Sequence, residues 1–267
     1  MVILLDGKKL AEKLTRSLTG KFKGVGKLAA VLVGENSASV LYLRKKGELA
    51  EKLGVKFELV KLPKNSSTKK VVEEIQRLNS DKGVAGIIVQ LPLPKQIDVD
   101  VVVNAALPNK DVDGLTDANI LSGNVLPATA TGILRLLTEY KIDLRNKKIG
   151  LVGFTRLLNL PLSLHFARLG NSVVVLQEGT KNFGELKMVD VIITAVGKPG
   201  LISGKDIKWG AVVIDAGIVT INGKVRGDCD ASVSKMAGWM TPVPGGVGPM
   251  TVVSLLVNLK KLAKTRL

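Results

Sequence analysis

The chain of 267 residues contains little cysteine, histidine or aromatic side chain. Its single cysteine, Cys229, excludes a disulfide framework and is typical of a protein from a reducing compartment. Its single histidine, His165, leaves no cluster of metal ligands, so no metal site is expected and His165 is interpreted as structural. No apolar run reaches the roughly 18 residues that span a membrane, and residues 1–6 lack the basic lead of an export signal. A cytoplasmic protein with no membrane partner is therefore expected.

Positive charge is the property in excess. The chain has 39 lysines and arginines against 23 acidic residues, a formal net charge of +16, and such a balance is common in proteins that bind nucleic acid. The lysines, however, are scattered in doublets such as Lys8-Lys9 and Lys69-Lys70, and aromatic residues, at 3%, are too few to stack on bases. No nucleic-acid partner is expected, and a basic nucleic-acid-binding α/β protein is kept as an alternative.

Strand-like and helix-like segments alternate along the chain. In the first third, strands are expected at residues 28–33, 55–60 and 84–91, with helices at 37–53 and 67–78. A second series has strands at 149–153, 172–177, 189–195 and 211–215 and a helix at 161–169. The alternation predicts an α/β fold of two parallel-sheet domains, the second a Rossmann-like dinucleotide-binding domain.

The expected domains are residues 1–117, completed by a C-terminal helical segment over 248–267, and residues 118–247. The segment 117–140 is expected to cross between them, and a closing helix over 252–263 to pack on the first domain. Gln90 falls at the carboxyl end of a strand expected to be buried on both faces, which is the edge where open α/β sheets bind ligands. An active cleft between the two domains is therefore predicted.

Residues 241–251 contain three prolines and three glycines. Such a composition argues against a regular helix or an interior strand through this stretch. Glycine lets a ligand approach the main chain, and proline lowers the entropy lost on ordering. A rigid ligand-contacting wall and a tight connection between domains both fit this composition.

The expected helix over 37–53 has one apolar face that includes a lysine. Counting from Tyr42, Lys46 follows at offset 4, and Leu49, Ala50 and Leu53 follow at offsets 7, 8 and 11. Lys46 is thus predicted to point inward, where burial favours a neutral amine, whereas Lys45 lies on the opposite face. A lysine that extends its ammonium group back to water is the alternative.

Five segments in order resemble the methylenetetrahydrofolate dehydrogenase/cyclohydrolase family, over essentially the whole chain. They are residues 42–46, 89–94, 110–114, 213–217 with Gly227-Asp228 behind them, and 241–251. The resemblance implies oxidation of 5,10-methylenetetrahydrofolate with NADP, then hydrolysis to 10-formyltetrahydrofolate. This chemistry belongs to the one-carbon metabolism that supplies purine biosynthesis. It also implies a homodimer whose partners are tetrahydrofolate derivatives, anionic molecules that suit a positively charged protein.

Specific roles follow from the resemblance. Lys46 would be the general acid/base, Tyr42 would lie against the substrate, Gln90 would bond the lysine, and Asp113 would bind the pterin through adjacent N–H donors. A turn at Asp113-Gly114 is the alternative role for that aspartate. The remaining substrate-binding residues would be Val89, Leu91, Pro244, Gly245, Gly246, Val247, Gly248, Pro249, Met250 and Thr251. The cofactor-binding residues would be Gly153, Phe154, Thr155, Arg156, Glu178 and Ile218.

The chain departs from the family pattern in the segment expected to bind the cofactor. Asn159 replaces a glycine of the phosphate loop, and Phe154 stands where some relatives have arginine. Glu178 favours the free ribose 2′-hydroxyl of NAD over the phosphate of NADP, whereas Arg156 and Lys181 favour NADP. A second departure, at residues 127–132, touches no residue assigned to proton transfer. An enzyme that retains only the cyclohydrolase step is therefore a further alternative.

Overall fold

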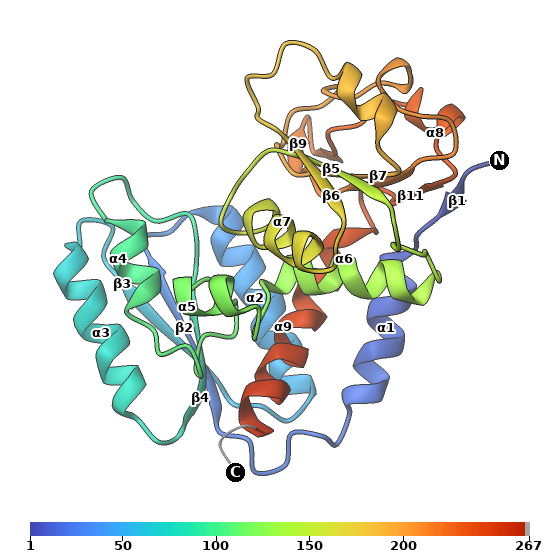
Figure 1. Cartoon of the computed structure of the whole chain (residues 1–267). Helices are drawn as coiled ribbons and strands as arrows, with labels where there is room; N and C mark the ends of the chain where they lie inside the picture. The colour runs from blue at the N-terminus through green and yellow to red at the C-terminus, as the bar shows by residue number, and fades with distance from the viewer. Residues whose placement is uncertain (265–267) are drawn as a thin grey trace. The chain divides into compact units, whose positions relative to one another are not determined.

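The structure is a computed structural model that describes residues 1–264 (Figure 1), so residues 265–267, the end of the expected C-terminal segment, lie outside the described residues. The chain forms two compact units, which we name by their main sheets. The six-stranded unit consists of Met1–Glu12 and Thr129–Thr251, and the three-stranded unit consists of Lys13–Ala128 and the chain from Val252 onward. Within the described residues, no helix is long and apolar enough to span a membrane.

The three-stranded unit is built on a parallel sheet of order β3-β2-β4. Its strands are β2 (Lys27–Val33), β3 (Phe57–Leu62) and β4 (Val84–Val89). Its helices are α2 (Ser37–Lys52), α3 (Thr68–Ser80), α4 (Val99–Asn104) and α5 (Asp117–Ser122). Every residue of β4 is buried, because its uninterrupted apolar sequence is covered on both faces.

Helices cover both faces of this sheet. One cluster of buried residues joins β2 and β4 to α3 and α4. Helix α2 packs on β2 and β3, and in Figure 1 it lies with α9 (Val247–Lys264) on the other side of the sheet from α3 and α4. The helix starts are set by local sequence, since Asn36 and Ser67 accept hydrogen bonds from Ser39 N at 3.0 Å and Lys70 N at 3.2 Å.

The six-stranded unit has an all-parallel sheet of order β1-β11-β8-β7-β5-β6. Its strands are β1 (Ile3–Leu4), β5 (Lys148–Val152), β6 (Ser172–Leu176), β7 (Val191–Thr194), β8 (Val212–Asp215) and β11 (Trp239–Met240). An antiparallel hairpin joins β9 (Val219–Ile221) and β10 (Lys224–Arg226). Its helices are α6 (Ala128–Glu139), α7 (Asn159–Arg168) and α8 (Val233–Met236), with 3₁₀ turns η1 (Gly184–Met188) and η2 (Gly204–Asp206). Helix α1 (Gly7–Leu18) begins in this unit, and its residues from Lys13 onward belong to the three-stranded unit.

The expected fold class, two α/β domains with parallel sheets, is confirmed, and the expected strands and helices lie within a few residues of the observed ones. The compact units nevertheless group the ends of the chain differently from the predicted domain ranges. Met1–Glu12 belongs to the six-stranded unit because β1 pairs with β11, where Leu5 N donates to Met240 O at 2.9 Å. Two residues of strand, too short for a periodic signal, decide this grouping.

One expectation about residues 241–251 is wrong. The proline and glycine content argued against a regular helix in this stretch, but α9 begins at Val247, close to the start of the helical segment expected over 248–267, so residues 247–251 are helical. Pro249 is tolerated there because it lies in the first turn, where backbone N–H groups have no acceptor within the helix. The irregular part is residues 241–246, which includes a cis peptide bond between Val243 and Pro244.

Candidate functional site

The buried face of α2 carries the candidate general acid/base. Lys46 is 7% exposed, whereas Lys45 is exposed, which confirms the inward direction expected from the helical spacing. Gly47 lets the helix approach β3, since a Cβ atom there would lie 2.8 Å from Cδ1 of Phe57. Tyr42 is half-buried one turn earlier on the same face, and burial raises the pKa of its hydroxyl. The alternative of a lysine that returns its ammonium group to water is therefore excluded.

Lys46 lies against the carboxylate of Asp113. Its Nζ is 3.5 Å from both Oδ1 and Oδ2, and the two side chains are 9% and 14% exposed. Burial raises the pKa of Asp113 above its ordinary value of 3.8, and the charge of Asp111 adds to this effect, while Lys46 acts in the opposite direction. The distance from Nζ to the carboxylate is longer than that of a strong charge-assisted hydrogen bond. The ammonium group and the carboxylate are therefore close, but each can still form stronger hydrogen bonds with other groups.

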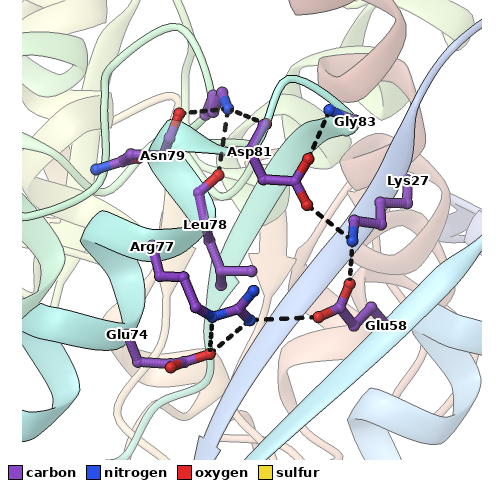
Figure 2. Close-up of polar contacts among 9 residues, drawn as sticks. Lys27, Glu58, Glu74, Arg77, Leu78, Asn79, Asp81 and Gly83 are labelled. Atoms are coloured by element: carbon purple, nitrogen blue, oxygen red, sulfur yellow. Dashed lines mark hydrogen bonds and ion pairs between the residues drawn. The ribbon is translucent and has the colours of Figure 1, made fainter.

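The segment 110–114 fixes Asp113 through its neighbours. Lys110 Nζ donates to the carbonyl oxygens of Leu78, Asn79 and Asp81 at 3.2, 2.6 and 2.8 Å, which closes the carboxyl end of α3. Figure 2 shows these carbonyl groups beside the ion pairs at the amino end of β2. Lys110, which the sequence assigned to a motif without a role, is therefore an internal helix cap.

Asp111 and Val112 are held as firmly. The Asp111 carboxylate accepts from Thr116 N at 2.8 Å and from Asn119 Nδ2 at 2.9 Å. The carbonyl oxygen of Val112 accepts from Asn258 Nδ2 of α9 at 3.0 Å. Asp111 also forms a parallel bridge with Ile87, so the chain runs beside β4 and places Asp113 toward the same carboxyl end as Gln90. Gly114 N donates a long hydrogen bond to Asp111 O at 3.4 Å, so the segment forms a turn at Asp113-Gly114. The turn and the position of Asp113 beside Lys46 are therefore both observed.

Gln90 does not make the bond that was expected of it. Its Nε2 donates to Leu91 O at 2.6 Å, and among the described residues it makes no hydrogen bond to Lys46. Its Oε1 is buried and has no hydrogen-bond partner within residues 1–264. Val89 is 6% exposed, Leu91 is half-buried, and the peptide bond between Leu91 and Pro92 is cis.

Ser39 is a polar residue that sequence reasoning missed. It is 3% exposed, and its buried hydroxyl has no hydrogen-bond partner in the part of the chain that the structure describes. It lies three residues before Tyr42 and seven before Lys46, so all three share one face of α2. The same helical count that selected Lys46 would have found it, had the count been extended one turn toward the amino end.

The expected substrate-binding stretch 244–251 belongs to the six-stranded unit. Pro244 is exposed, Gly245, Gly248, Pro249 and Thr251 are half-buried, and Gly246 and Val247 are buried. Met250 is fully buried and lies close to Gly132, so its side chain is part of the interior. Hydrogen bonds from Lys8 N to Gly245 O and from Gly246 N to Pro242 O, both 2.8 Å, hold the backbone in place.

The residues assigned to the cofactor lie in three loops that follow parallel strands of the six-stranded unit. Gly153, exposed Phe154, exposed Thr155 and half-buried Arg156 follow β5, exposed Glu178 follows β6, and Ile218, 45% exposed, follows β8. The strand order places β6 on one side of β5 and β7 on the other, so the chain reverses direction across the sheet at β5. The carboxyl ends of strands at such a reversal are where α/β sheets bind dinucleotides.

Two buried carboxylates hold the loops after β7 and β8. Asp228, fully buried, accepts from Thr194 Oγ1 at 2.6 Å and from the N–H groups of Val196, Gly197 and Lys198 at 2.7–2.8 Å. Asp215 accepts from the N–H groups of Gly217, Asp228 and Cys229 at 2.9–3.0 Å. Burial raises the pKa of Asp215, and also that of the Cys229 thiol. The aspartates of the motif 213–217 with Gly227-Asp228 therefore hold the backbone of the loops at the carboxyl ends of β7 and β8.

Comparison with known proteins covers the whole chain. Residues 5–113 match the catalytic domain of the tetrahydrofolate dehydrogenase/cyclohydrolase family, and residues 127–267 match its NAD(P)-binding domain. The bifunctional protein FolD of Helicobacter pylori is 39% identical over 96% of this chain and 94% of its own length. That of Lactobacillus delbrueckii is 42% identical over 98% and 97%.

Solved structures agree with the sequence relatives. The bifunctional FolD methylenetetrahydrofolate dehydrogenase/cyclohydrolase of Campylobacter jejuni superposes with a TM-score of 0.95 at 36% identity, covering 100% of both chains. The Trypanosoma brucei enzyme, solved with NADP and an inhibitor, gives 0.93 at 30% identity over 99% and 98%. These matches do not favour the two alternatives considered from the sequence, a basic nucleic-acid-binding protein and an enzyme that retains only the cyclohydrolase step. The chain belongs to the tetrahydrofolate dehydrogenase/cyclohydrolase family and is a bifunctional enzyme with a catalytic and an NAD(P)-binding domain.

Proposed function

We propose that the chain oxidises 5,10-methylenetetrahydrofolate to 5,10-methenyltetrahydrofolate with NAD(P)⁺ and then hydrolyses the product to 10-formyltetrahydrofolate, with Lys46 as general acid/base. The observation that carries the proposal is a buried lysine, 3.5 Å from a buried carboxylate, on a helix whose other lysine at the adjacent position faces solvent. Family membership supplies the reaction. The geometry supplies the proton carrier.

Lys46 has a defined task in the hydrolytic step. Water adds to the methenyl carbon, and a base must take one proton from it as the C–O bond forms. Opening of the ring then breaks the bond from that carbon to one folate nitrogen, which must gain a proton. One amine placed at this carbon can perform both transfers, which is general base followed by general acid catalysis.

Asp113, Gln90 and Ser39 supply the polar contacts for the pterin. Asp113 is held at the edge of the sheet by the bonds to Asp111 and Val112, and its two oxygens can accept from two adjacent donors. Gln90 Oε1 and Ser39 Oγ are buried and have no hydrogen-bond partner among the described residues, so a ligand that reached them after a side-chain rotation would remove the cost of leaving them unpaired.

The six-stranded unit fits a nicotinamide dinucleotide. Gly153 has φ +79°, and a Cβ there would lie 3.1 Å from Cγ2 of Val196, so only glycine suits this turn at the end of β5. Residues of the loops after β5, β6 and β8 would hold the cofactor, which accepts the hydride when bound. Asp215 and Asp228 keep the neighbouring loops rigid.

The choice between NAD and NADP centres on Glu178. The side chain is exposed two residues beyond β6, and Gly153 N donates to Leu176 O at 2.9 Å, which brings the ends of β5 and β6 together. An anion in this place repels a 2′-phosphate, while the net charge of +16 favours the more anionic cofactor. We take NADP as the physiological cofactor, with Glu178 limiting the preference over NAD.

Glu178→Ser tests this assignment. Removal of the anion should shift the ratio of kcat/KM for NADP over NAD toward NADP by about tenfold, or 1.4 kcal/mol. Glu185→Ser in η1 of the same unit is the matched change in charge at a site away from these loops, and should leave the ratio unaltered. Equal ratios in wild type and Glu178→Ser would place this carboxylate away from the ribose.

We also propose that the chain is a cytoplasmic homodimer paired through β6. This strand is at the edge of its sheet and carries three consecutive valines, with Val175 37% exposed. An apolar edge strand of this kind pairs readily with another chain. Val175→Lys should give a monomer by light scattering, and Val225→Lys, at an equally exposed valine of β10, should not. A dimeric Val175→Lys protein would contradict this interface.

The main experiment is an absorbance assay of purified protein with methylenetetrahydrofolate, run in parallel with NAD and NADP. Formation of reduced cofactor establishes the first step. Loss of methenyltetrahydrofolate absorbance without any cofactor, above the uncatalysed rate, establishes the second. Absence of both activities in folded protein would overturn the proposed function, and absence of the first alone would leave a cyclohydrolase.

A further inference from the structure

Helix α7 begins with a buried asparagine. Asn159 is 1% exposed, and its Nδ2 donates to Val152 O at 2.9 Å and to Gly153 O at 2.7 Å. Its Oδ1 is also buried and has no hydrogen-bond partner among the described residues. In the sequence, Asn159 departs from the glycine of the family's phosphate loop. In the structure, its side chain makes two hydrogen bonds to backbone carbonyl groups.

The two bonds of Asn159 close the turn between β5 and α7. Gly153 is fixed on one side by its N–H, which donates to Leu176 O at 2.9 Å, and on the other by its carbonyl, which accepts from Asn159. The following backbone turns at Thr155, whose carbonyl oxygen accepts from Leu158 N at 3.2 Å and from Leu160 N at 3.1 Å. The Val152 and Gly153 carbonyl oxygens are turned toward Asn159, and the exposed residues of the turn are Phe154, Thr155 and Leu157.

The position of this turn gives the contacts their functional meaning. It lies at the carboxyl end of β5, where the strand order reverses and where the pyrophosphate of a dinucleotide meets the following helix. A phosphate-binding turn must be ordered before the ligand arrives, because ordering it on binding would weaken the affinity. The buried Oδ1 has no partner among the described residues, although buried acceptors in folded proteins are nearly always paired, so the two Nδ2 bonds are the contacts that account for this side chain.

We propose that Asn159 is a positioning residue of the dinucleotide site. Its side-chain amide fixes the glycine turn from inside the unit, so that the backbone of the turn is ordered before the dinucleotide binds. The proposal rests on the proposed use of NAD(P). It implies that replacement of the loop glycine by asparagine preserves the site instead of marking its decay.

The chain contains a matched control at the opposite end of the same strand. Asn171 is also buried, at 9% exposure, and its Nδ2 also bridges two carbonyl oxygens, those of Leu144 at 2.6 Å and Lys147 at 3.0 Å. Lys147 immediately precedes β5, so this bridge lies at the amino end of the strand, away from the ligand-binding edge. The two asparagines share their chemistry and burial and differ in which end of β5 they hold.

The test compares Asn159→Asp with Asn171→Asp in the full chain. Each replacement keeps the shape but turns an N–H donor into an oxygen that repels the two carbonyl groups, so both should lower Tm. Asn159→Asp should weaken binding of NADP⁺ and of NAD⁺ by about tenfold or more in titration calorimetry. Asn171→Asp should bind both with the affinity of the wild type.

A second variant covers the case in which Asn159→Asp does not fold. Asn159→Ala removes the bridge without adding charge and without restoring the family glycine, and should also weaken dinucleotide binding and speed amide hydrogen exchange over residues 153–158 in the absence of cofactor. Unchanged affinity in a folded Asn159 variant, or equal losses in the Asn159 and Asn171 variants, would overturn the inference. If the wild type itself bound neither dinucleotide, the dehydrogenase half of the proposed function would fail with it.

Discussion

In the three-stranded unit, the lysine–carboxylate group around Lys27 and the pair of Lys46 and Asp113 differ in character. Lys27, at the amino end of β2, lies 2.6 Å from Glu58 and 2.9 Å from Asp81, with the three side chains 23–33% exposed (Figure 2). Lys46 lies 3.5 Å from Asp113, with side chains 9% and 14% exposed. The distances in the more exposed Lys27 group are those of strong ion pairs. The distance in the buried Lys46–Asp113 pair is longer, so both partners can still form hydrogen bonds with other groups.

The pKa values of the carboxylates in the two groups are shifted in opposite directions. Hydrogen bonding with Lys27 lowers the pKa of both Glu58 and Asp81, while burial raises the pKa of Asp113. The Lys27 group favours its ionised carboxylates, whereas burial disfavours ionisation of Asp113, and shifted carboxylates of this kind are common at functional sites. We interpret the Lys27 group as one that orders the surface and the Lys46–Asp113 pair as part of the proposed ligand site.

The largest effect is expected at Lys46. Lys46→Met keeps the volume and removes the proton carrier, so the cyclohydrolase rate should fall by about a hundredfold or more, the scale of general acid/base catalysis. The control is Lys45→Met on the exposed side of α2, which should change the rate little. Similar rates for the two variants would contradict the distinction drawn from the helical face.

Asp113→Asn should weaken folate binding by about tenfold or more, because hydrogen bonds to a charged acceptor are stronger than those to a neutral amide. Calorimetry with tetrahydrofolate measures the affinity. The matched change in the exposed group, Asp81→Asn, should leave it unaltered. If Asp113→Asn bound folate normally, the carboxylate would serve only the turn.

The same two variants should respond to pH in opposite senses. Since the pKa of folded Asp113 lies above its ordinary 3.8, its contribution to stability is full below that pH and is lost as pH rises through the folded value. Asp113→Asn should therefore have a higher Tm than wild type near neutral pH, and the difference should vanish in acid. Asp81, whose pKa is lowered, stabilises the fold above 3.8, so Asp81→Asn should have the lower Tm at neutral pH. A lower Tm for Asp113→Asn at neutral pH would show that its pairing with Lys46 outweighs burial.

The smallest effect is expected at Lys27. Lys27→Met removes exposed ion pairs, which contribute little and are screened by salt, so Tm should fall slightly and the loss should shrink in 1 M NaCl. Both activities should remain at the wild-type level. A large, salt-insensitive loss of Tm would mean that this group is as important to the fold as the buried contacts.

The sequence predicted much of the candidate site because α2 is a regular helix. A periodic count requires only that a helix form and that its apolar face be buried, so it identified Lys46 and separated it from Lys45. The same count could not identify what Lys46 meets, because Asp113 is 67 residues away. It also could not predict that Gln90 would bond Leu91, since that choice depends on side-chain rotation within the packed unit.

The sequence by itself determined the order of strands and helices, the inward lysine and the family, because these depend on local periodicity and on motifs that stay contiguous in the chain. Only the tertiary structure decided that β1 joins the six-stranded sheet, that Lys110 caps α3 and that Asn159 closes the turn at Gly153. Each of these contacts satisfies a backbone group or strand edge that the rest of the fold would otherwise leave unpaired. Which side chain meets such a group depends on packing between segments and not on local propensity.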